Sequence, residues 1–166
     1  NSGRRQRQMC IRDRLYPKLI KGLVLTGSSG LYENSMGDSY PKREDYRYIK
    51  ERTEAVFFDP KIATKEIVDE VYETVNDRKK LIKILAMAKS AIRHNMSNDL
   101  PNILAETAII WGENDSVTPP EVADEFKKLL PNSQLFWIEN CGHAPMMEHP
   151  EKFNSVMNSW LREKKL

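Results

Sequence analysis

The sequence predicts an α/β protein with about three parallel strands and flanking helices. Three short runs carry no charge and are rich in β-branched, leucine or aromatic residues, at 23–26, 107–111 and 134–138. Such runs are typical of strands buried on both faces of a parallel sheet. The last two runs are joined by one amphipathic helix through short connections, which indicates a parallel crossover unit. Between residues 31 and 101 there is no strand pattern, so we expect a separate helical segment there.

The first strand lies near the start of the folded region. Residues 15–20 are expected to end a preceding helix, with Tyr16-Pro17 closing it, because the residue before a proline disfavours helix. The strand at 23–26 follows. Gly27-Ser28-Ser29-Gly30 then forms its terminal loop, which we interpret as a turn.

The helical segment is predicted to contain three helices. The first covers residues 40–57, the second is capped by Thr64, and the third is opened by Asp77. The apolar face of the third helix is wide, since Ile84 and Met87 enlarge it. We therefore expect that helix to touch partners on two sides.

The second half of the chain alternates strands and helices. After the strand at 107–111, Thr118 fits the N-cap of a helix, with proline at its first position and Glu121 as the partner in a capping box. The strand at 134–138 follows. In the last helix His149 is expected to act as a cap, and apolar residues at three-and-four spacing form a core face. Met87, Met146 and Met147 are expected to fill core gaps more often than to line a pocket.

Two titratable residues follow the second and third strands. Asp115 lies in the loop after residue 111 and His143 in the loop after residue 138. Because parallel strands end at the same edge of a sheet, the two side chains are expected within hydrogen-bond reach. A carboxylate beside an imidazole holds the ring tautomer and stabilises the imidazolium that forms during proton transfer. Taken alone, an aspartate placed like Asp115 is more often a turn or cap residue, and a histidine placed like His143 more often a surface or structural residue. Their joint placement after consecutive parallel strands favours the catalytic interpretation.

The segments around these two residues resemble a known superfamily. WGENDSVTPPE and CGHAPMMEHPEKFN are similar to the acid loop and the histidine loop of the α/β-hydrolase fold, in the branch of esterases, carbon-carbon bond hydrolases and lipase-like enzymes. The likeness covers residues 15–166, and the order acid before histidine agrees with it. It implies that Asp115 is the triad acid and His143 the general base, whereas Glu148 and Pro150 match the start of the last helix.

The nucleophile of that superfamily has no counterpart in the sequence. No G-x-S-x-G pattern occurs, and Gly27-Ser28-Ser29-Gly30 has the wrong spacing. The resemblance therefore implies the C-terminal portion of a hydrolase, in which residues 15–30 and 102–166 form a partial core and residues 31–101 a helical cap or lid. Val117 is a candidate for pocket lining.

Two functional hypotheses follow. The chain supplies the acid and the histidine of a serine-type hydrolase acting on an ester or a carbon-carbon bond, with a small-molecule substrate and no cofactor or metal. Where an aspartate replaces the serine, the family includes dehalogenases and epoxide hydrolases. Alternatively, the chain is an inactive truncated fragment or a non-enzymatic binding module of the same fold.

Composition limits the partners. The chain has 40% hydrophobic and 30% charged residues, as in ordinary globular proteins. Five of its 26 basic residues lie in residues 1–14, so the remainder is slightly acidic and no nucleic-acid partner is expected. Residues 1–14 are either a basic tail or a segment foreign to the fold that resembles translated sequencing-adaptor read-through. Two cysteines that form no disulfide framework favour a reduced, cytoplasmic compartment. No membrane partner is expected, and the oligomeric state stays open.

Overall fold

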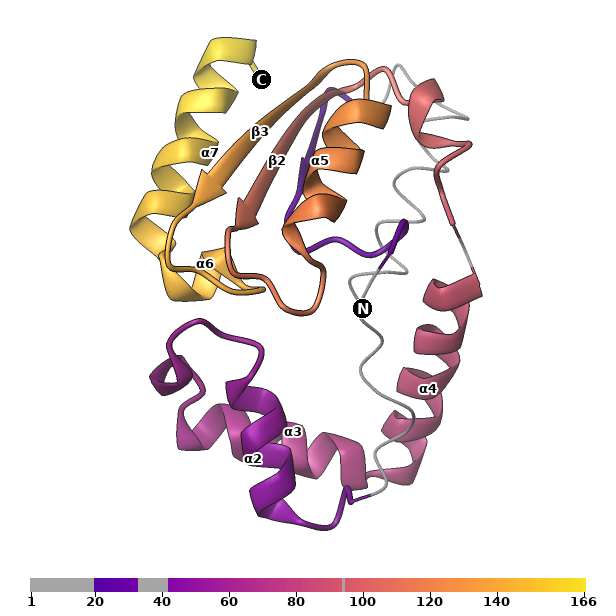
Figure 1. The fold of residues 1–166 in the computed structure, drawn as a ribbon, viewed down its shortest axis with the longest axis vertical. Coiled ribbons are helices and arrows are strands. Elements are labelled where there is room, and N and C mark those ends of the chain that lie inside the picture. The colour runs from indigo at the N-terminus through magenta and orange to yellow at the C-terminus, as the bar shows by residue number, and fades with distance from the viewer. Residues whose placement is uncertain (1–19, 33–41, 94) are drawn as a thin grey trace.

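The computed structural model describes residues 20–32, 42–93 and 95–166, and has a sheet body and a helical layer (Figure 1). The sheet contains β1 (Gly22–Leu25), β2 (Glu106–Gly112) and β3 (Ser133–Ile138). All pairs are parallel and the order is β1-β2-β3. The predicted fold class, about three parallel strands with flanking helices, is therefore confirmed.

Helices cover both faces of the sheet, and the alternation along β2 decides which residues meet them. Ile109 and Trp111 belong to the cluster that includes Phe126 of α5 (Pro120–Leu129). Ala108 and Ile110 belong to the opposite cluster, which includes Trp160 of α7 (Pro150–Lys164). Residues 107–112 are buried throughout, which explains why β2 is uncharged after its first residue.

Two predicted helix starts are corrected in this body. The N-cap of α5 is Pro119, without a side-chain cap, so the capping box built on Thr118 and Glu121 is wrong. Thr118 instead turns its buried hydroxyl to the Asp115 carboxylate, which needs hydrogen-bond donors once it is buried. His149 does stand at the N-cap of α7, but its Nε2 donates to the Asn140 carbonyl at 3.0 Å rather than capping the helix.

The helical layer comprises α2 (Tyr46–Glu54), the short η2 (Pro60–Ile62), α3 (Lys65–Asn76) and α4 (Arg78–Arg93). Asp45 accepts from the amides of Arg47 and Tyr48, so α2 starts later than the predicted residue 40, and residues 40–41 lie outside the described ranges. Thr64 caps α3 and Asp77 accepts from two amides of α4, as predicted.

Four apolar side chains depart from their expected packing. Ile82 and Leu85 of α4 are 59% and 38% exposed, so the prediction that its wide face packs on two sides is wrong within the described residues. Met146 and Met147 in α6 (Pro145–Glu148) are also exposed, and the core role expected of them is wrong. Residues 1–14, and residues 15–19 of the predicted helix end, fall outside the described ranges.

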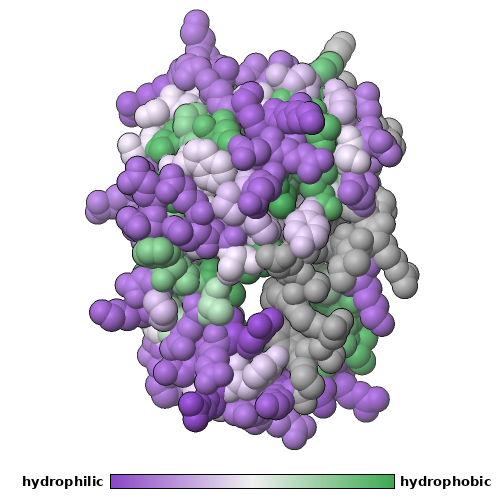
Figure 2. Space-filling view, in the orientation of Figure 1, coloured by the Kyte–Doolittle hydropathy of each residue, from purple (hydrophilic) through white to green (hydrophobic). Residues whose placement is uncertain are grey.

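The chain returns from α4 to the sheet through η3 (Leu100–Asn102), whose buried Leu100 joins the α5-side core. Figure 2 shows that hydrophilic side chains dominate the face in view and that hydrophobic ones gather in separate patches. No helix in the described part of the chain is both long and apolar enough to cross a membrane.

Candidate active site

The loops after β2 and β3 lie against each other at the edge of the sheet that faces the helical layer (Figure 1). We call residues 113–119 the acid loop and residues 139–144 the histidine loop. The amide of Asn114 donates to the carbonyl of Cys141 at 2.9 Å, and the amide of Glu113 to Ile138 at 3.1 Å. A Cβ atom on Gly112 would overlap the backbone of the histidine loop, so glycine permits this approach.

Asp115 is a buried carboxylate, with 3% of its surface exposed. Its Oδ1 accepts from the amides of Val117 at 2.8 Å and Thr118 at 2.9 Å. Its Oδ2 accepts from the Thr118 hydroxyl at 2.8 Å. The bonds within the loop show that Asp115 is also a turn residue, and that the turn holds the carboxylate in one orientation.

His143 supplies a further hydrogen-bond contact to that carboxylate. Its Nδ1 lies 2.9 Å from Oδ2 and 3.1 Å from Oδ1 of Asp115. An ionised carboxylate only accepts hydrogen bonds, so Nδ1 carries the proton and Nε2 of a neutral ring presents a lone pair. Within the described ranges Nε2 has no hydrogen-bond partner, and 28% of the side chain is exposed. The arrangement can therefore accept a proton at Nε2.

Thr118 and Gly27 were not singled out by the sequence as neighbours of His143. The Thr118 hydroxyl lies 3.3 Å from Nδ1 and bridges the acid and the imidazole. Gly27 has φ +49°, and a Cβ there would meet the His143 ring at 2.8–2.9 Å. The loop after β1, predicted to be a turn, thus packs directly on the imidazole.

The helical layer reaches both loops through residues 55–58. The His143 amide donates to the carbonyl of Val56 at 3.0 Å, and the Ser116 hydroxyl donates to the carbonyl of Ala55 at 3.1 Å. Val117, the predicted pocket residue, is half-buried, and its amide is used by Asp115. Whether its side chain lines a substrate pocket stays a prediction.

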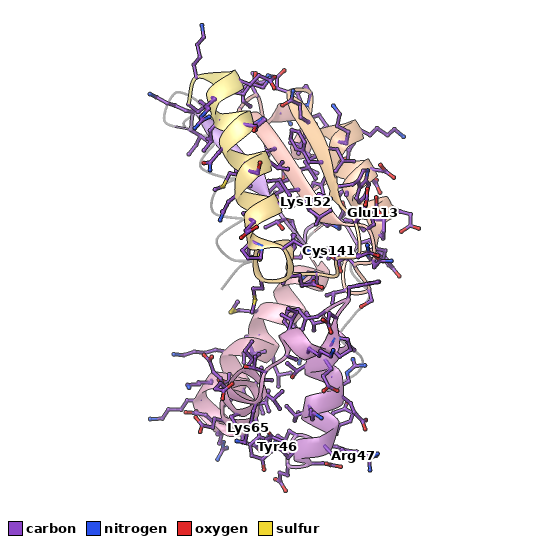
Figure 3. All side chains as sticks on the ribbon, turned by 90° about the vertical axis from the view of Figure 1, so that its left-hand side faces the viewer. Tyr46, Arg47, Lys65, Glu113, Cys141 and Lys152 are labelled. Atoms are coloured by element: carbon purple, nitrogen blue, oxygen red, sulfur yellow. The ribbon has the colours of Figure 1, made fainter. Side chains whose placement is uncertain are left out.

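Glu148 is a further residue whose contacts the sequence did not reveal. Its carboxylate accepts from the amides of Gly142 at 2.8 Å and Phe58 at 2.7 Å. The neighbouring Cys141 is buried, and desolvation together with Glu148 raises the pKa of its thiol to about 12. Figure 3 places Cys141 at the end of the sheet body that faces the helical layer. His149 stays outside the site, and the described residues hold no group of three side chains suited to a metal ion.

Comparison with known proteins gives this geometry a context. A family profile described as alpha/beta hydrolase fold matches residues 11–150. The solved structure of MGS-MChE2, an alpha/beta hydrolase enzyme from the metagenome of lagoon sediments of Mar Chica, Morocco, is 48% identical, with a TM-score of 0.69 over 95% of this chain and 57% of that one.

Two curated relatives carry names of different activities. Lipase 1 of Psychrobacter immobilis is 26% identical over 80% of this chain and 45% of its own length. A 2-hydroxy-6-oxononadienedioate/2-hydroxy-6-oxononatrienedioate hydrolase of Pseudomonas sp. is 24% identical over 88% of this chain and 56% of its own. The chain thus spans about half the length of these relatives.

Proposed function

Because the chain belongs to the alpha/beta hydrolase fold family, we propose that Asp115 and His143 are the acid and the general base of a serine-type hydrolase. The observation that carries the proposal is the 2.9 Å contact between His143 Nδ1 and the buried carboxylate, with Nε2 left to accept a proton. Asp115 orients the ring and stabilises the imidazolium that forms.

In the proposed reaction Nε2 of His143 removes the proton of a nucleophilic hydroxyl and later delivers it to the leaving group. The sequence has no G-x-S-x-G elbow, so the proposal assigns the nucleophile to polypeptide outside these 166 residues. An acyl-enzyme would then be hydrolysed by water that His143 activates in the same way.

The proposed substrate is a small molecule with an ester or an activated carbon-carbon bond. The names of the lipase and the dienedioate hydrolase among the relatives support these two bond types. Residues 31–101 would form the cap over the site, since residues 55–58 already contact both loops. Val117 would line the pocket beside the acid.

The second candidate is that the isolated chain binds without catalysis. The missing elbow favours this outcome for the 166 residues alone. We expect no turnover of p-nitrophenyl esters above background by the isolated chain. Turnover that disappears in His143→Ala would contradict this second candidate.

The test of the enzyme hypothesis uses a longer protein in which this chain is joined to a segment with the elbow. His143→Ala and Asp115→Asn should each lower kcat by about 10³- to 10⁴-fold, as in other triads. Glu151→Ala is the control, because Glu151 is exposed in the first turn of α7, outside both loops, and its loss should leave activity unchanged. An active protein in which His143→Ala keeps full activity would overturn the proposal.

A further inference from the structure

Glu148 joins the histidine loop to the helical layer, two parts of the molecule that are far apart in sequence. It is the last residue of α6, and its two carboxylate oxygens accept from two different amides. Oε1 accepts from Gly142 in the histidine loop and Oε2 from Phe58 in the helical layer, 90 residues away. One side chain therefore bridges the loop that carries the base and the layer that lies opposite it.

The bridged segment is already in contact with the base. The Val56 carbonyl accepts from the His143 amide at 3.0 Å, two residues from the Phe58 amide that Glu148 holds. A Cβ on Gly142 would meet the backbone of Val56, Phe57 and Phe58 at 2.7–3.0 Å. The backbone of residues 56–58 thus lies in close contact with that of residues 142–143. Glu148 hydrogen-bonds to one amide on each of these two segments.

Both acceptors are needed at this position. A carboxylate presents two acceptor oxygens, whereas an amide of the same shape presents one oxygen and one NH₂ donor. A glutamine at this position would place its NH₂ donor opposite the amide N–H donor of either Phe58 or Gly142. The Cys141 thiol, 3.7 Å from Oε1, adds a weak donor and no competing charge, because its raised pKa keeps it protonated.

We propose that Glu148 is a positioning residue that couples the helical layer to the catalytic histidine. Through the Phe58 and Gly142 amides it holds residues 56–58 against the histidine loop. The position of the His143 backbone therefore depends on the position of the helical layer. Only the predicted effect of Glu148 on catalysis rests on the proposed function. The coupling itself is a property of the 166-residue chain.

The first experiment measures amide hydrogen exchange in the 166-residue chain and in Glu148→Gln. Exchange at Phe58 and Gly142 should quicken by about 10-fold or more, since each of these amides donates to a charged acceptor that the variant lacks. Exchange at His143, whose amide donates to the Val56 carbonyl, should quicken as residues 56–58 move away from the histidine loop. Amides of β2 and α5 should keep their protection. Glu151→Gln, an exposed glutamate in the first turn of α7, is the matched control and should change none of them.

The second experiment measures kinetics in the longer protein that contains a nucleophile. Glu148→Gln should lower kcat by about 10- to 100-fold with little change in KM, because it displaces the base rather than the substrate. Unchanged exchange at Phe58, Gly142 and His143 would overturn the coupling. An inactive parent protein would instead count against the proposed function and leave the exchange result valid.

If Glu148→Gln fails to fold, Glu148→Asp tests the same point. Aspartate retains the charge and both oxygens, but it is one methylene shorter and cannot reach both amides at once. Faster exchange at Phe58 or Gly142 would support the coupling. Full protection of both amides in this variant would overturn it.

Discussion

At the scale of single residues, the site depends on how one buried charge is satisfied. The Asp115 carboxylate accepts from two backbone amides, the Thr118 hydroxyl and the His143 ring. A buried carboxylate without such donors would be strongly destabilising. The same bonds therefore stabilise the fold and orient the carboxylate towards Nδ1. The interpretation of Asp115 as a turn residue is compatible with the hypothesis that it is the acid of a triad.

Thr118→Val tests the contribution of the hydroxyl to this arrangement. We expect unfolding free energy to fall by about 1.5–3 kcal/mol, because an isosteric methyl replaces a donor to a buried charge. Thr118→Ser retains the donor and should lose clearly less. Urea unfolding measures both values. Equal losses in the two variants would show that packing of the side chain, not its hydroxyl, is what matters.

Gly27→Ala tests the contact between the β1 loop and the imidazole. The added methyl group meets the His143 ring and the residue has φ +49°, so we expect lower stability and a shifted ring resonance in NMR spectra. Gly30→Ala is the matched control, because Gly30 also has positive φ but faces Met96. A ring resonance that moves equally in both variants would contradict a direct contact.

The raised pKa of the Cys141 thiol predicts that the protein loses stability in alkaline solution. Its folded pKa of about 12 lies above the ordinary value of 9.0, so the native state holds the thiol proton more tightly than the unfolded state. The stabilisation is complete below pH 9 and is lost as the pH rises towards 12. By pH 11 we expect a loss of roughly 1–3 kcal/mol relative to pH 8.

The comparison for Cys141 is made with Cys141→Ala, which lacks the titrating group but keeps the tyrosines and lysines. The unfolding free energy of the unmodified chain should fall more steeply between pH 9 and 11 than that of the variant. Parallel curves would contradict the raised pKa. The native thiol should also resist alkylation at pH 8, since it is both buried and protonated.

At the scale of elements, local signals were sufficient for most of the fold. The strands follow from short uncharged runs, and the starts of α3 and α4 follow from Thr64 and Asp77, whose partners lie within three residues. The pairing of Asp115 with His143 followed from strand direction alone. Each of these inferences needs only a nearby partner or a rule of parallel topology.

Contacts between distant segments could not be inferred in the same way. Glu148 meets Phe58 across 90 residues, and Gly27 meets His143 through a packed loop, and neither follows from a periodic pattern. Thr118 was assigned to a cap because its local sequence fits one, but the buried acid three residues earlier takes its hydroxyl. Here a tertiary requirement overrides a local preference.

Asp77→Ala tests an element-scale prediction. Asp77 accepts from the amides of Lys79 and Lys80, and the backbone bond to Lys80 is the main cause that lowers its pKa. Its stabilising effect is therefore present at neutral pH and is lost as the pH falls through its lowered pKa. We expect faster amide exchange at the start of α4 in the variant at pH 7. Equal exchange would show that this end is held by packing alone.

At the scale of the whole molecule, the edges of the sheet decide whether the chain associates in solution. β2 is paired on both sides, whereas no strand in the described ranges pairs with β1 on the side away from β2. Leu23 and Leu25 are buried and Val24 is half-buried, so the strand is apolar on both faces. An apolar edge with unpaired amides and carbonyls is a template for another strand.

We therefore predict that the 166-residue chain associates as its concentration rises, through the edge of β1 that lies away from β2. Light scattering coupled to size exclusion should show the mean mass increasing with loading concentration and returning on dilution. The formal net charge is only +2, so charge repulsion opposes this weakly. Because backbone pairing and apolar burial are little screened by salt, association should persist at high ionic strength. Association that salt abolishes would indicate charged contacts instead, and a monodisperse monomer at every concentration would show that the β1 edge is protected.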